Sequence, residues 1–436
     1  MEVEILAQRI VQTSDMVWLL DPAEPMLGPV ADKGLIVARV SPGCWGPMIT
    51  PDYPSGHEVT RPVAVEGAEV GDAVALKIRK IRVLSLATTS GTDRFVEDNF
   101  VGDPFVAKRC PNCGTVNPET YVEGIGPDAI RCKVCGHPVH PFELANGYTM
   151  LFDDDRSVGV TVPPEVGYEI ARQAAEFSAL PRESRQYSAN LLAKGDIPGT
   201  VARVRPMIGN IGSCPAVPMP SSHNAGDFGS FLVGAPHQYA LTQEELLKRT
   251  DGHMDVNEVR EGTVVLVPVK VTGAGIYIGD VHAMMGDGEI AGHTTDVSAE
   301  VIIEVEVIKG LELDGPVLLP HLEDLPYLAR PYTATEVDRA RKVASVYGFE
   351  VHTEMLPIQV LGSAPNLNDA VTNALERASR LTGWPVAEVK NRATITGAVD
   401  IGRLPGVVQL SLLVPKNKLE SLGILHLVQE QYGNQS

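Results

Sequence analysis

The chain has 436 residues, of which 44% are hydrophobic and 21% charged, and its formal net charge is −19 at pH 7. A chain of this composition can bury a core, and its acidic balance argues against the basic surface that binding to nucleic acid or to an anionic membrane requires. The 41 glycines and 33 prolines favour many turns and short strands over a helical bundle.

The start of the sequence shows no basic segment followed by a long apolar run, so no signal peptide is visible. No uncharged apolar stretch approaches the length that a membrane-spanning helix needs. Six cysteines are too few for a disulfide scaffold in a chain of this length. These features predict a cytoplasmic protein with reduced thiols.

Changes in composition divide the chain into four parts. Short apolar runs between Gly and Pro turns come first, and a polar, turn-rich segment with four of the six cysteines follows. A strongly β-prone stretch comes next, and helical periodicity marks the end. We therefore expect an α+β, mainly β fold with an N-terminal β part at 1–83, an insertion at 84–156 that contains a zinc ribbon at 110–137, a β-rich core with the candidate site at 157–330, and a C-terminal α/β part at 331–436.

Hydrophobic periodicity predicts the individual elements. Apolar runs bounded by turn residues predict strands at 35–40, 62–65, 73–81, 263–271, 297–307 and 407–414. Apolar residues at helical spacing predict helices at 164–177, 242–249, 335–346 and 367–381, and a shorter one after Pro385. Thr242 and Glu245 form a capping-box pattern at the second of these helices.

Two Cys-x-x-Cys motifs, each followed by glycine, give the most specific signal in the chain. Each motif lets one tight turn point two sulfurs at a single ion, and the glycine permits the positive φ that such a turn needs. A four-cysteine zinc site of this kind is structural, because it leaves no coordination position open for chemistry. Its role is to hold together an insertion too small for its own core, or to form a docking surface for a partner or a neighbouring subunit. The expected ligands are Cys110, Cys113, Cys132 and Cys135, with His137 and His140 just beyond as the credible substitutes for one cysteine.

Residues 279–289, GDVHAMMGDGE, crowd three carboxylates and a histidine into a bend between two β-prone runs. Acids and glycines between strands often form no more than a solvated loop. Here the alternation of Asp280 and His282 places a carboxylate and an imidazole on the same side of an extended chain. Asp287 and Glu289 repeat the alternation within one turn. This pattern favours a functional cluster over a surface loop.

A further alternating pair, His253 and Asp255, stands upstream in the stretch 250–255, TDGHMD. Carboxylates and imidazoles together suit Zn²⁺, Mn²⁺ or a similar ion. The same groups also serve proton transfer, in which a carboxylate orients a histidine or acts itself as the base. The residues alone leave both roles open.

At these motifs the chain resembles the acetamidase/formamidase family of amide hydrolases. Members of that family show a block like G-D-x-H-A-x-Q-G-D-G-E, which residues 279–289 match except that Met285 replaces glutamine. Other similar stretches are 206–212 (PMIGNIG), 394–404 (TITGAVDIGRL) and 413–416 (LVPK), and the whole resemblance covers roughly residues 58–82 and 200–416.

The resemblance implies hydrolysis of a small carboxamide to a carboxylate and ammonia, in a β-rich fold that forms homo-oligomers. It also leads us to expect a second divalent metal ion, with Zn²⁺ among the candidates, that activates water or the amide carbonyl. The expected ligands are Asp255, Asp280 and His282, with His253 in a position that the family lacks, and the expected catalytic residues are Glu289 as general base, His282, and Asp287, which orients the turn or a ligand.

Departures from the family pattern point to a substrate other than plain formamide or acetamide. Thr250 stands where the family has histidine, and Asp251 and His253 replace a glycine and an asparagine. The inserted segment 220–248 precedes this altered block, and its Gly-rich residues 220–229 form either a lid or specificity loop, or an ordinary surface loop. The residues expected to contact the substrate are His223, Asp227 and Met285.

Two other hypotheses compete with metal-assisted hydrolysis. Cys214 offers a thiolate nucleophile for the amide, although a buried free cysteine that acts as a small hydrophobic residue is the more common case. Alternatively, the chain is a catalytically altered relative that binds a small ligand, or binds a protein partner through its zinc ribbon. The altered block 250–255 favours that alternative, whereas the intact acidic block argues against it, because buried carboxylates without a function are costly.

Overall fold

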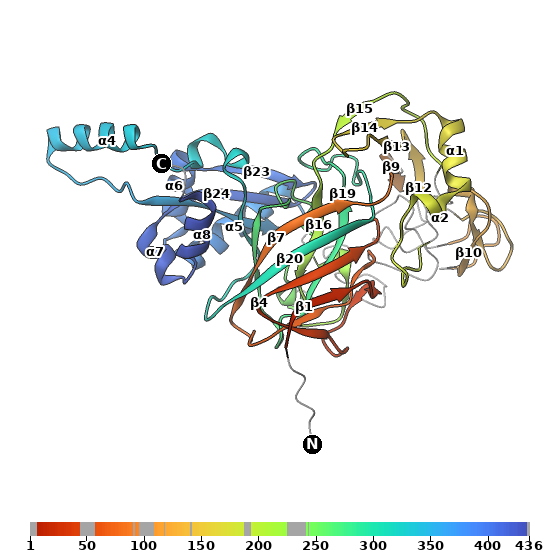
Figure 1. Cartoon of the computed structure of the whole chain (residues 1–436), viewed down its shortest axis with the longest axis horizontal. Helices are drawn as coiled ribbons and strands as arrows, with labels where there is room; N and C mark the ends of the chain where they lie inside the picture. The colour runs from red at the N-terminus through yellow and green to blue at the C-terminus, as the bar shows by residue number, and fades with distance from the viewer. Residues whose placement is uncertain are drawn as a thin grey trace, which may run out of the picture.

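The structure, a computed structural model, describes residues 7–43, 57–89, 92–95, 109–116, 118–139, 142–186, 193–224, 241–242 and 244–433. One long sheet runs through the middle of the molecule, the C-terminal helices lie at one end, and a smaller β region with α1 (Pro164–Arg172) and α2 (Ala174–Phe177) lies at the other (Figure 1). This architecture confirms the predicted α+β, mainly β fold class. In the part of the chain that the structure covers, no helix is both long and apolar enough to cross a membrane.

The central sheet joins fourteen strands, and two of its pairings, β1 with β4 and β4 with β6, are parallel. β1 (Gln8–Thr13) pairs with β4, and β16 (Met207–Ser213) pairs with β19. The order along the main path is β2 (Met16–Val17), β5 (Val59–Thr60), β19 (Ile276–His282), β6 (Val63–Val65), β4 (Leu27–Val40), β20 (Ala299–Ile308), β7 (Ala73–Val83), β18 (Val264–Pro268), β21 (Val317–Leu319), β22 (Met355–Ser363), β24 (Val407–Pro415) and β23 (Ala398–Arg403).

Smaller elements surround this sheet. Four short strands form a separate sheet in the order β15 (Val201–Arg203), β14 (Val158–Thr161), β13 (Tyr148–Phe152) and β8 (Ala87–Thr89). The other short strands form three two-stranded pairs: β9 (Thr92–Phe95) with β12 (Phe142–Ala145), β10 (Thr120–Val122) with β11 (Ile130–Cys132), and β3 (Leu19–Leu20) with β17 (Met219–Pro220). The remaining helices are α4 (Ala334–Tyr347), α5 (Leu367–Thr382), α6 (Val386–Thr396), α7 (Lys416–Ser421) and α8 (Leu425–Tyr432), and the 3₁₀ turns are η1 (Pro127–Ala129), η3 (Ser221–His223), η4 (Glu245–Lys248), η5 (Leu322–Asp324) and η6 (Tyr327–Ala329).

Two hydrophobic cores hold the sheet. One surrounds β4, β7, β19 and β20, and the other joins β22 and β24 to α5, α6 and α8. β20 shows the predicted alternation, since Val301, Ile303 and Val305 are fully buried while Glu300 and Glu304 are partly exposed. Each buried side chain of this size contributes about 1.5–3 kcal/mol. A one-residue slip would expose the whole set, so the alternation fixes the register.

The predicted elements are largely present, and the differences have local causes. The predicted helix at 164–177 is split into α1 and α2, because the N–H of Gln173 bonds to the carbonyl of Ile170 and tightens the turn. Thr242 and Glu245 make the capping contacts that were predicted, but the turn that follows them is the 3₁₀ turn η4. The division into four parts stays a prediction, and strands from its first, third and fourth parts share the central sheet.

Sequence patterns gave no strand at β16 or β22, and they placed Asp280 and His282 in a bend between two β-prone runs where the structure has β19. All residues of these three strands are buried. A strand covered on both faces shows no alternation of apolar and polar residues, so its pattern resembles that of any apolar run.

A buried ion pair ties the C-terminal helices to the rest of the fold. Arg377 of α5 places Nη2 2.5 Å from Asp251 Oδ2, and Ser363 of β22 donates a hydrogen bond of 2.6 Å to the same oxygen. Burial would raise the pKa of Asp251, but Arg377 and Arg249 together hold it below its usual range. The loop that carries Asp251 is therefore fixed by groups from a distant part of the chain.

We expect Asp251→Asn to destabilise the fold by about 3–5 kcal/mol, because Arg377 would be left buried without a counter-charge. The midpoint of urea-induced unfolding measures the effect. Glu354→Gln is the matched control, since Glu354 is exposed and pairs with Lys416 at 3.9 Å. Equal midpoints for the two variants would contradict a structural role for the Asp251–Arg377 pair.

Candidate metal and active site

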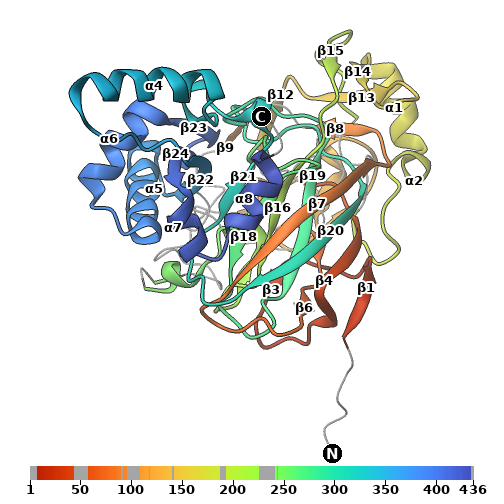
Figure 2. The same cartoon turned by 60° about the vertical axis from the view of Figure 1, so that its left-hand side comes forward.

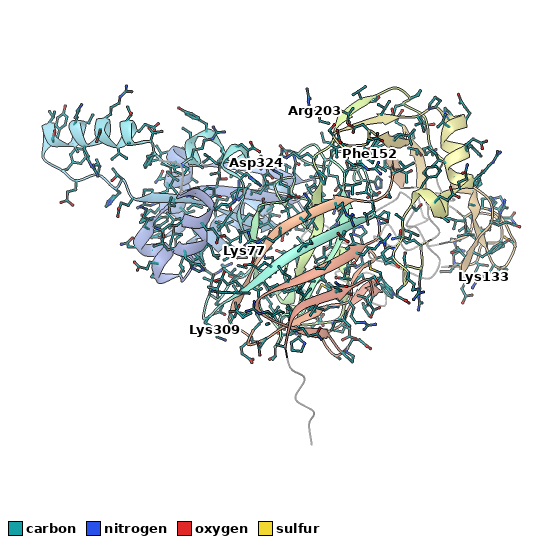
Figure 3. All side chains as sticks on the ribbon, viewed as in Figure 1. Lys77, Lys133, Phe152, Arg203, Lys309 and Asp324 are labelled. Atoms are coloured by element: carbon teal, nitrogen blue, oxygen red, sulfur yellow. The ribbon has the colours of Figure 1, made fainter. Side chains whose placement is uncertain are left out.

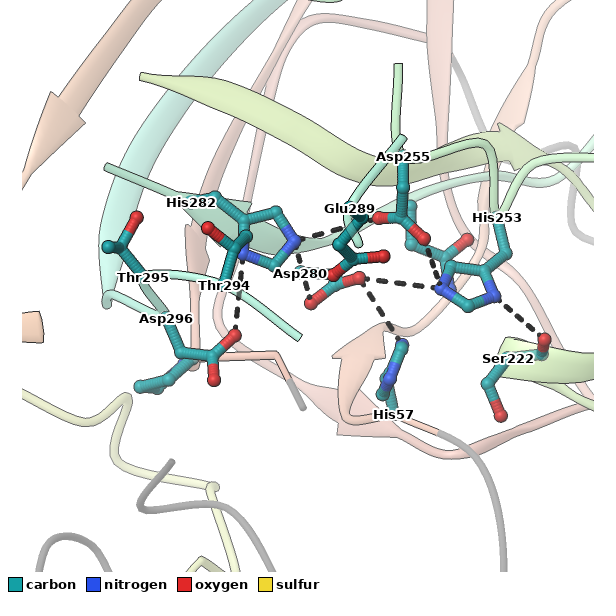
Figure 4. Close-up of polar contacts among 12 residues, drawn as sticks. His57, Ser222, His253, Asp255, Asp280, His282, Glu289, Thr294, Thr295 and Asp296 are labelled. Atoms are coloured by element: carbon teal, nitrogen blue, oxygen red, sulfur yellow. Dashed lines mark hydrogen bonds and ion pairs between the residues drawn. The ribbon is translucent and has the colours of Figure 1, made fainter. Parts of the chain in front are cut away.

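Buried acids and histidines meet at the end of β19, and Figure 4 shows their side chains close together. Asp280 and His282 come from β19, and Glu289 comes from the loop that follows it. His253 and Asp255 come from the segment between η4 and β18. All five side chains belong to residues that are 4% exposed or less. The fold thus brings together the two motifs that the sequence singled out.

Asp255, Asp280 and His282 surround one small volume. His282 Nε2 lies 3.6 Å from Asp255 Oδ1 and 3.4 Å from Asp280 Oδ1. These distances are too long for strong hydrogen bonds. They match the separation of about 3.4 Å between two ligands that are each about 2.1 Å from one tetrahedral ion. The spacing of the three side chains therefore fits a shared cation.

The space between the three ligands depends on Gly209 of β16. A Cβ atom at this position would lie 2.2 Å from Asp255 Oδ1, 2.8 Å from Asp280 Oδ2 and 2.9 Å from His282 Nε2. These atoms are buried and make no hydrogen bond within the described residues. Buried carboxylate oxygens are costly unless positive charge faces them. The donors and the space both fit a divalent cation such as Zn²⁺ or Mn²⁺.

Asp280 and His282 shift each other's pKa against the effect of burial. Burial would raise the pKa of Asp280, but His57 and His282 hold it well below its usual range. Burial would lower the pKa of His282, but Asp280 raises it well above the usual value. His282 Nδ1 faces Asp296 Oδ1 at 3.4 Å. A carboxylate in this position orients the ring so that Nε2 points into the cluster.

Glu289 lies beside this ligand set and contacts Arg403 at the end of β23. Burial raises the pKa of Glu289 to about 8, and the nearby Asp255 adds to the shift. Arg403 Nε lies 3.0 Å from Glu289 Oε2, and Arg403 Nη1 lies 2.7 Å from Asp255 Oδ2. A carboxyl group with a pKa near neutrality can take up and release a proton at physiological pH. Glu289 therefore suits the role of a general base.

The backbone is strained at three residues of the cluster. Asp255, Asp280 and Glu289 have φ values of 46°, 54° and 40°. Such left-handed conformations are uncommon outside glycine and cost on the order of 1–3 kcal/mol each. Asp280 and His282 do converge as expected, but Asp280 reaches the cluster from a left-handed backbone and not from an extended one. Strain of this kind concentrates at functional sites.

Three other residues that the sequence predicted for the site, Asp287, Met285 and His223, take part in none of the contacts described above. Asp287 is exposed, and its Oδ1 accepts a hydrogen bond of 3.2 Å from Asn257. Met285 is buried, and His223 is buried in η3. Asp227 lies outside the described residues. Contacts of these four residues with the substrate or the reacting groups stay predictions.

Thr250 and Cys214 have structural surroundings. The Thr250 hydroxyl donates a hydrogen bond to the carbonyl of Ser213 and accepts one of 2.8 Å from Asn224. Cys214 is fully buried in an apolar cluster with Tyr277, and burial raises the pKa of its thiol to about 12. A thiol in this environment stays protonated at neutral pH, so it is a poor nucleophile.

Sequence reasoning missed two residues of the cluster, His57 and Arg403. His57 Nδ1 lies 3.5 Å from Asp280 Oδ2, and the His57 and His253 rings make an edge-to-face contact with centroids 4.8 Å apart. Arg403 was visible as the basic residue of the stretch 394–404 that resembles the family. His57 gave a weaker signal, a polar residue two positions before a short buried strand.

The four predicted zinc ligands also come together. Cys110 Sγ lies 3.7 Å from Cys135 Sγ, and Cys113 Sγ lies 3.9 Å from Cys132 Sγ. Two sulfurs that are each 2.3 Å from one tetrahedral ion are about 3.8 Å apart. Gly114 and Gly136 have φ values of 72° and 71°, as predicted for the turns after each motif. The cysteines are thus arranged for a metal ion of zinc's size and geometry.

Comparison with known proteins identifies the family. The profile of the Acetamidase/Formamidase family matches residues 46–250 and 246–420. The chain therefore belongs to the acetamidase/formamidase family. A protein of Schizosaccharomyces pombe whose assigned name is that of a formamidase is 32% identical over 273 residues, which are 61% of this chain and 56% of that protein. The chain thus matches somewhat more than half the length of this curated relative.

Two solved structures share the fold at low sequence identity. A recombinant predicted acetamidase/formamidase from the thermophile Thermoanaerobacter tengcongensis is 19% identical, with 95% of this chain and 98% of that chain covered and a TM-score of 0.52. An acetamidase from Yersinia enterocolitica is 14% identical, with 97% and 94% covered and a TM-score of 0.52. At these identities the likeness concerns the fold alone.

We expect Gly209→Ala to abolish cation binding at Asp255, Asp280 and His282, because the added methyl group would fill the space between the ligand atoms. Elemental mass spectrometry of the purified variant measures the loss, and circular dichroism checks the fold. Gly286→Ala is the matched control, since no atom lies within 4 Å of a Cβ at that position. Unchanged metal content in Gly209→Ala would contradict a cation site between these three residues.

Proposed function

We propose that the chain hydrolyses a small carboxamide to a carboxylate and ammonia. Family membership supports amide hydrolysis, and the Schizosaccharomyces pombe relative carries the name of a formamidase. The observation that carries the proposal is the buried set of Asp255, Asp280 and His282 with Glu289 beside it. This arrangement offers a cation site and a proton acceptor within one cluster.

Each residue has a role that its position supports. Asp255, Asp280 and His282 would hold a divalent cation, which would polarise the amide carbonyl and lower the pKa of water. Glu289 accepts a proton from the attacking water as the water oxygen bonds to the carbonyl carbon. The same carboxyl group gives the proton to the amide nitrogen as the carbon–nitrogen bond breaks, so ammonia leaves with a carboxylic acid, which loses its proton to water at neutral pH and becomes the carboxylate. Arg403 holds the Glu289 carboxylate in place through the 3.0 Å contact.

We expect Glu289→Gln to lower kcat by about 10²–10⁴-fold, because glutamine keeps the size of glutamate but cannot accept the proton. Ammonia release from a series of short carboxamides measures the rate, and elemental mass spectrometry shows whether the metal content is unchanged. Glu66→Gln, at an exposed turn, is the control. Loss of metal in Glu289→Gln would make Glu289 a ligand, and an unchanged rate would remove it as the base.

We propose further that the four cysteines hold a structural zinc ion. The tight sulfur–sulfur distances support this, and the cysteine-bearing segment packs through Ile125 against α1 and α2. Figure 3 shows Lys133 of this segment at the outer edge of the molecule. The zinc would therefore hold a peripheral ribbon together, and contact with a partner through this ribbon stays a prediction.

We expect Cys132→Ser/Cys135→Ser to lose one zinc ion per chain and to make the ribbon sensitive to protease, because a small metal-bound segment unfolds without its metal. Amide hydrolysis should continue, since neither Cys132 nor Cys135 belongs to the buried cluster of acids and histidines. Zinc content and limited proteolysis measure the first effect. Full zinc content in the double variant would contradict the four-cysteine site.

We propose that the chain forms a homo-oligomer through α4. Val343, Val346, Tyr347 and Phe349 in and after this helix are 59%, 76%, 78% and 55% exposed, and Ala344 is the buried residue of the helix. Figures 1 and 2 both show α4 at the outer edge of the molecule. A single helix of this length is marginal in water, so a covering surface would stabilise it.

Charge favours a second copy of the chain as the surface that covers α4. The helix carries Arg339, Arg341 and Lys342 against Glu336 and Asp338, a net charge of +1 (three minus two), whereas the chain as a whole has a net charge of −19. A basic and apolar helix is therefore complementary to the acidic surface of another copy.

We expect Val346→Glu/Tyr347→Glu to convert the oligomer to a monomer, because two charges would enter the apolar contact. Size-exclusion chromatography with light scattering measures the mass. Val201→Glu, at a position that is 68% exposed in β15, is the control and should leave the mass unchanged. A wild-type chain that is already monomeric would contradict the role of α4.

A further inference from the structure

We infer that Asn224 is a positioning residue, which holds the segment 250–255 in a fixed position relative to β19. The inference rests on the proposed function, because the segment supplies Asp255 to the candidate site and β19 supplies Asp280. Asn224 follows η3 directly, at the start of the inserted segment 220–248, and it is fully buried. Its hydrogen bonds reach both the segment 250–255 and β19.

Asn224 binds the first half of the segment 250–255 through three of its atoms. Its Oδ1 accepts the N–H of Thr250 at 2.8 Å and the N–H of Asp251 at 3.3 Å. Its Nδ2 donates to Thr250 Oγ1 at 2.8 Å. Its backbone carbonyl accepts the N–H of His253 at 3.3 Å. Buried N–H groups without an acceptor are costly, so the position of Asn224 restricts where the segment can lie.

The conformation that these bonds hold is a strained one. Asp251 and Asp255 have φ values of 56° and 46°, in the left-handed region. Residues other than glycine keep such a backbone only where the surrounding structure enforces it. Because Asn224 Oδ1 accepts the N–H of Asp251 itself, Asn224 belongs to the surroundings that enforce it.

The other end of the link is Tyr277, in the same strand as Asp280. Asn224 Nδ2 donates a hydrogen bond of 2.8 Å to the Tyr277 hydroxyl, and Tyr277 is fully buried. A Cβ atom at Gly252 would lie only 2.1 Å from that hydroxyl oxygen, so the phenol packs directly against the backbone of the segment. One amide group thus joins the two parts of the chain that supply Asp255 and Asp280.

An asparagine fits this position better than an aspartate does. The Thr250 hydroxyl donates its one hydrogen to the carbonyl of Ser213, so it can only accept from residue 224. Aspartate has no hydrogen to give when it is ionised, and its second oxygen would face the lone pairs of Thr250 Oγ1. Thr250 stands where the family has histidine, so a departure from the family pattern and the inserted segment meet in the Asn224–Thr250 bond.

Backbone contacts with β16 offer a competing explanation of how the segment is held. The N–H of Ile211 bonds to the carbonyl of Gly252, and the N–H of Met254 bonds to the carbonyl of Gly209, both at 2.9 Å. If these bonds alone fixed the segment, Asn224 would contribute to stability and not to the reaction. Activity and local hydrogen exchange distinguish the two cases.

The first test compares Asn224→Ala with Thr161→Ala at a temperature at which circular dichroism shows both variants folded. Thr161 is the matched control, because its buried hydroxyl also makes two hydrogen bonds, to the carbonyl of Ile197 and from the N–H of Thr200, in and beside the four-stranded sheet.

The substrate is the short carboxamide that the wild type hydrolyses fastest. We expect kcat for ammonia release to fall about 10²-fold in Asn224→Ala with KM little changed, because a small displacement of the reacting groups has an effect of this size. Thr161→Ala should keep its kcat. Equal losses in the two variants, or an unchanged kcat in Asn224→Ala, would overturn the inference.

Tyr277→Phe tests the link to β19 with less risk to the fold, because it removes one hydroxyl group and keeps the ring. We expect a smaller fall in kcat than in Asn224→Ala. The double variant Asn224→Ala/Tyr277→Phe should be no slower than Asn224→Ala, because the two residues act through one shared bond. Losses that multiply in the double variant would contradict the link.

Hydrogen exchange separates this inference from the proposed function, because it needs no substrate. Peptides that contain the N–H groups of Thr250 and Asp251 should exchange faster in Asn224→Ala than in the wild type, whereas Thr161→Ala should leave them unchanged. This difference in a protein that releases no ammonia from any carboxamide would overturn the proposed function and leave Asn224 as the residue that holds the segment. Unchanged exchange in an active enzyme would leave the function and overturn the role of Asn224.

Discussion

Carboxylates that are buried must be matched by positive charge, and the rest of the site follows from this constraint. Asp255 and Asp280 are at most 1% exposed, and transferring such charges out of water costs several kcal/mol each. Histidines, Arg403 and a space that fits a cation surround them. Gly209 leaves that space free, and Gly43 lies so close to Asp280 that a Cβ there would be 1.3 Å from Oδ1. The left-handed backbone at Asp255 and Asp280 is tolerated because these surroundings hold it in place.

Two parts of the fold meet at this cluster. β16 and β19 supply Gly209, Asp280 and His282 from the first core, whereas β23 at the far edge of the sheet supplies Arg403. The Asp251–Arg377 pair fixes the loop just before His253 against α5. The C-terminal helices therefore do more than cover the end of the sheet: they help to position the residues of the site.

Local patterns made much of this arrangement predictable. The spacing of Cys110 and Cys113, and of Cys132 and Cys135, determines the geometry of each turn, so the convergence of the four cysteines could be predicted without knowledge of the fold. The alternation of Asp280 with His282 likewise pointed to a cluster. Three helices of the C-terminal part, α4, α5 and α6, were predicted, whereas α7 and α8 were not. In the structure α4 begins at a Thr333–Glu336 capping box and ends at Gly348 in the left-handed conformation.

Contacts between distant segments could not be predicted in this way. His57 lies more than two hundred residues before Asp280 in the sequence, and Arg403 lies more than one hundred residues after it. No spacing rule links residues so far apart. β22 was missed because both of its faces are buried, which removes the alternation that identifies a strand. The position of Asp287, whose alternation with Glu289 suggested a shared role, depends on a turn that leaves Asp287 exposed and Glu289 buried.

The most direct test of this account is X-ray diffraction from crystals of the wild-type chain, with anomalous difference maps recorded on both sides of the absorption edge of the bound metal. The account predicts strong peaks between Asp255, Asp280 and His282, in addition to a peak at the four cysteines. A map with a peak at the cysteines alone, and with the carboxylate of Asp280 paired only to protein groups, would contradict it.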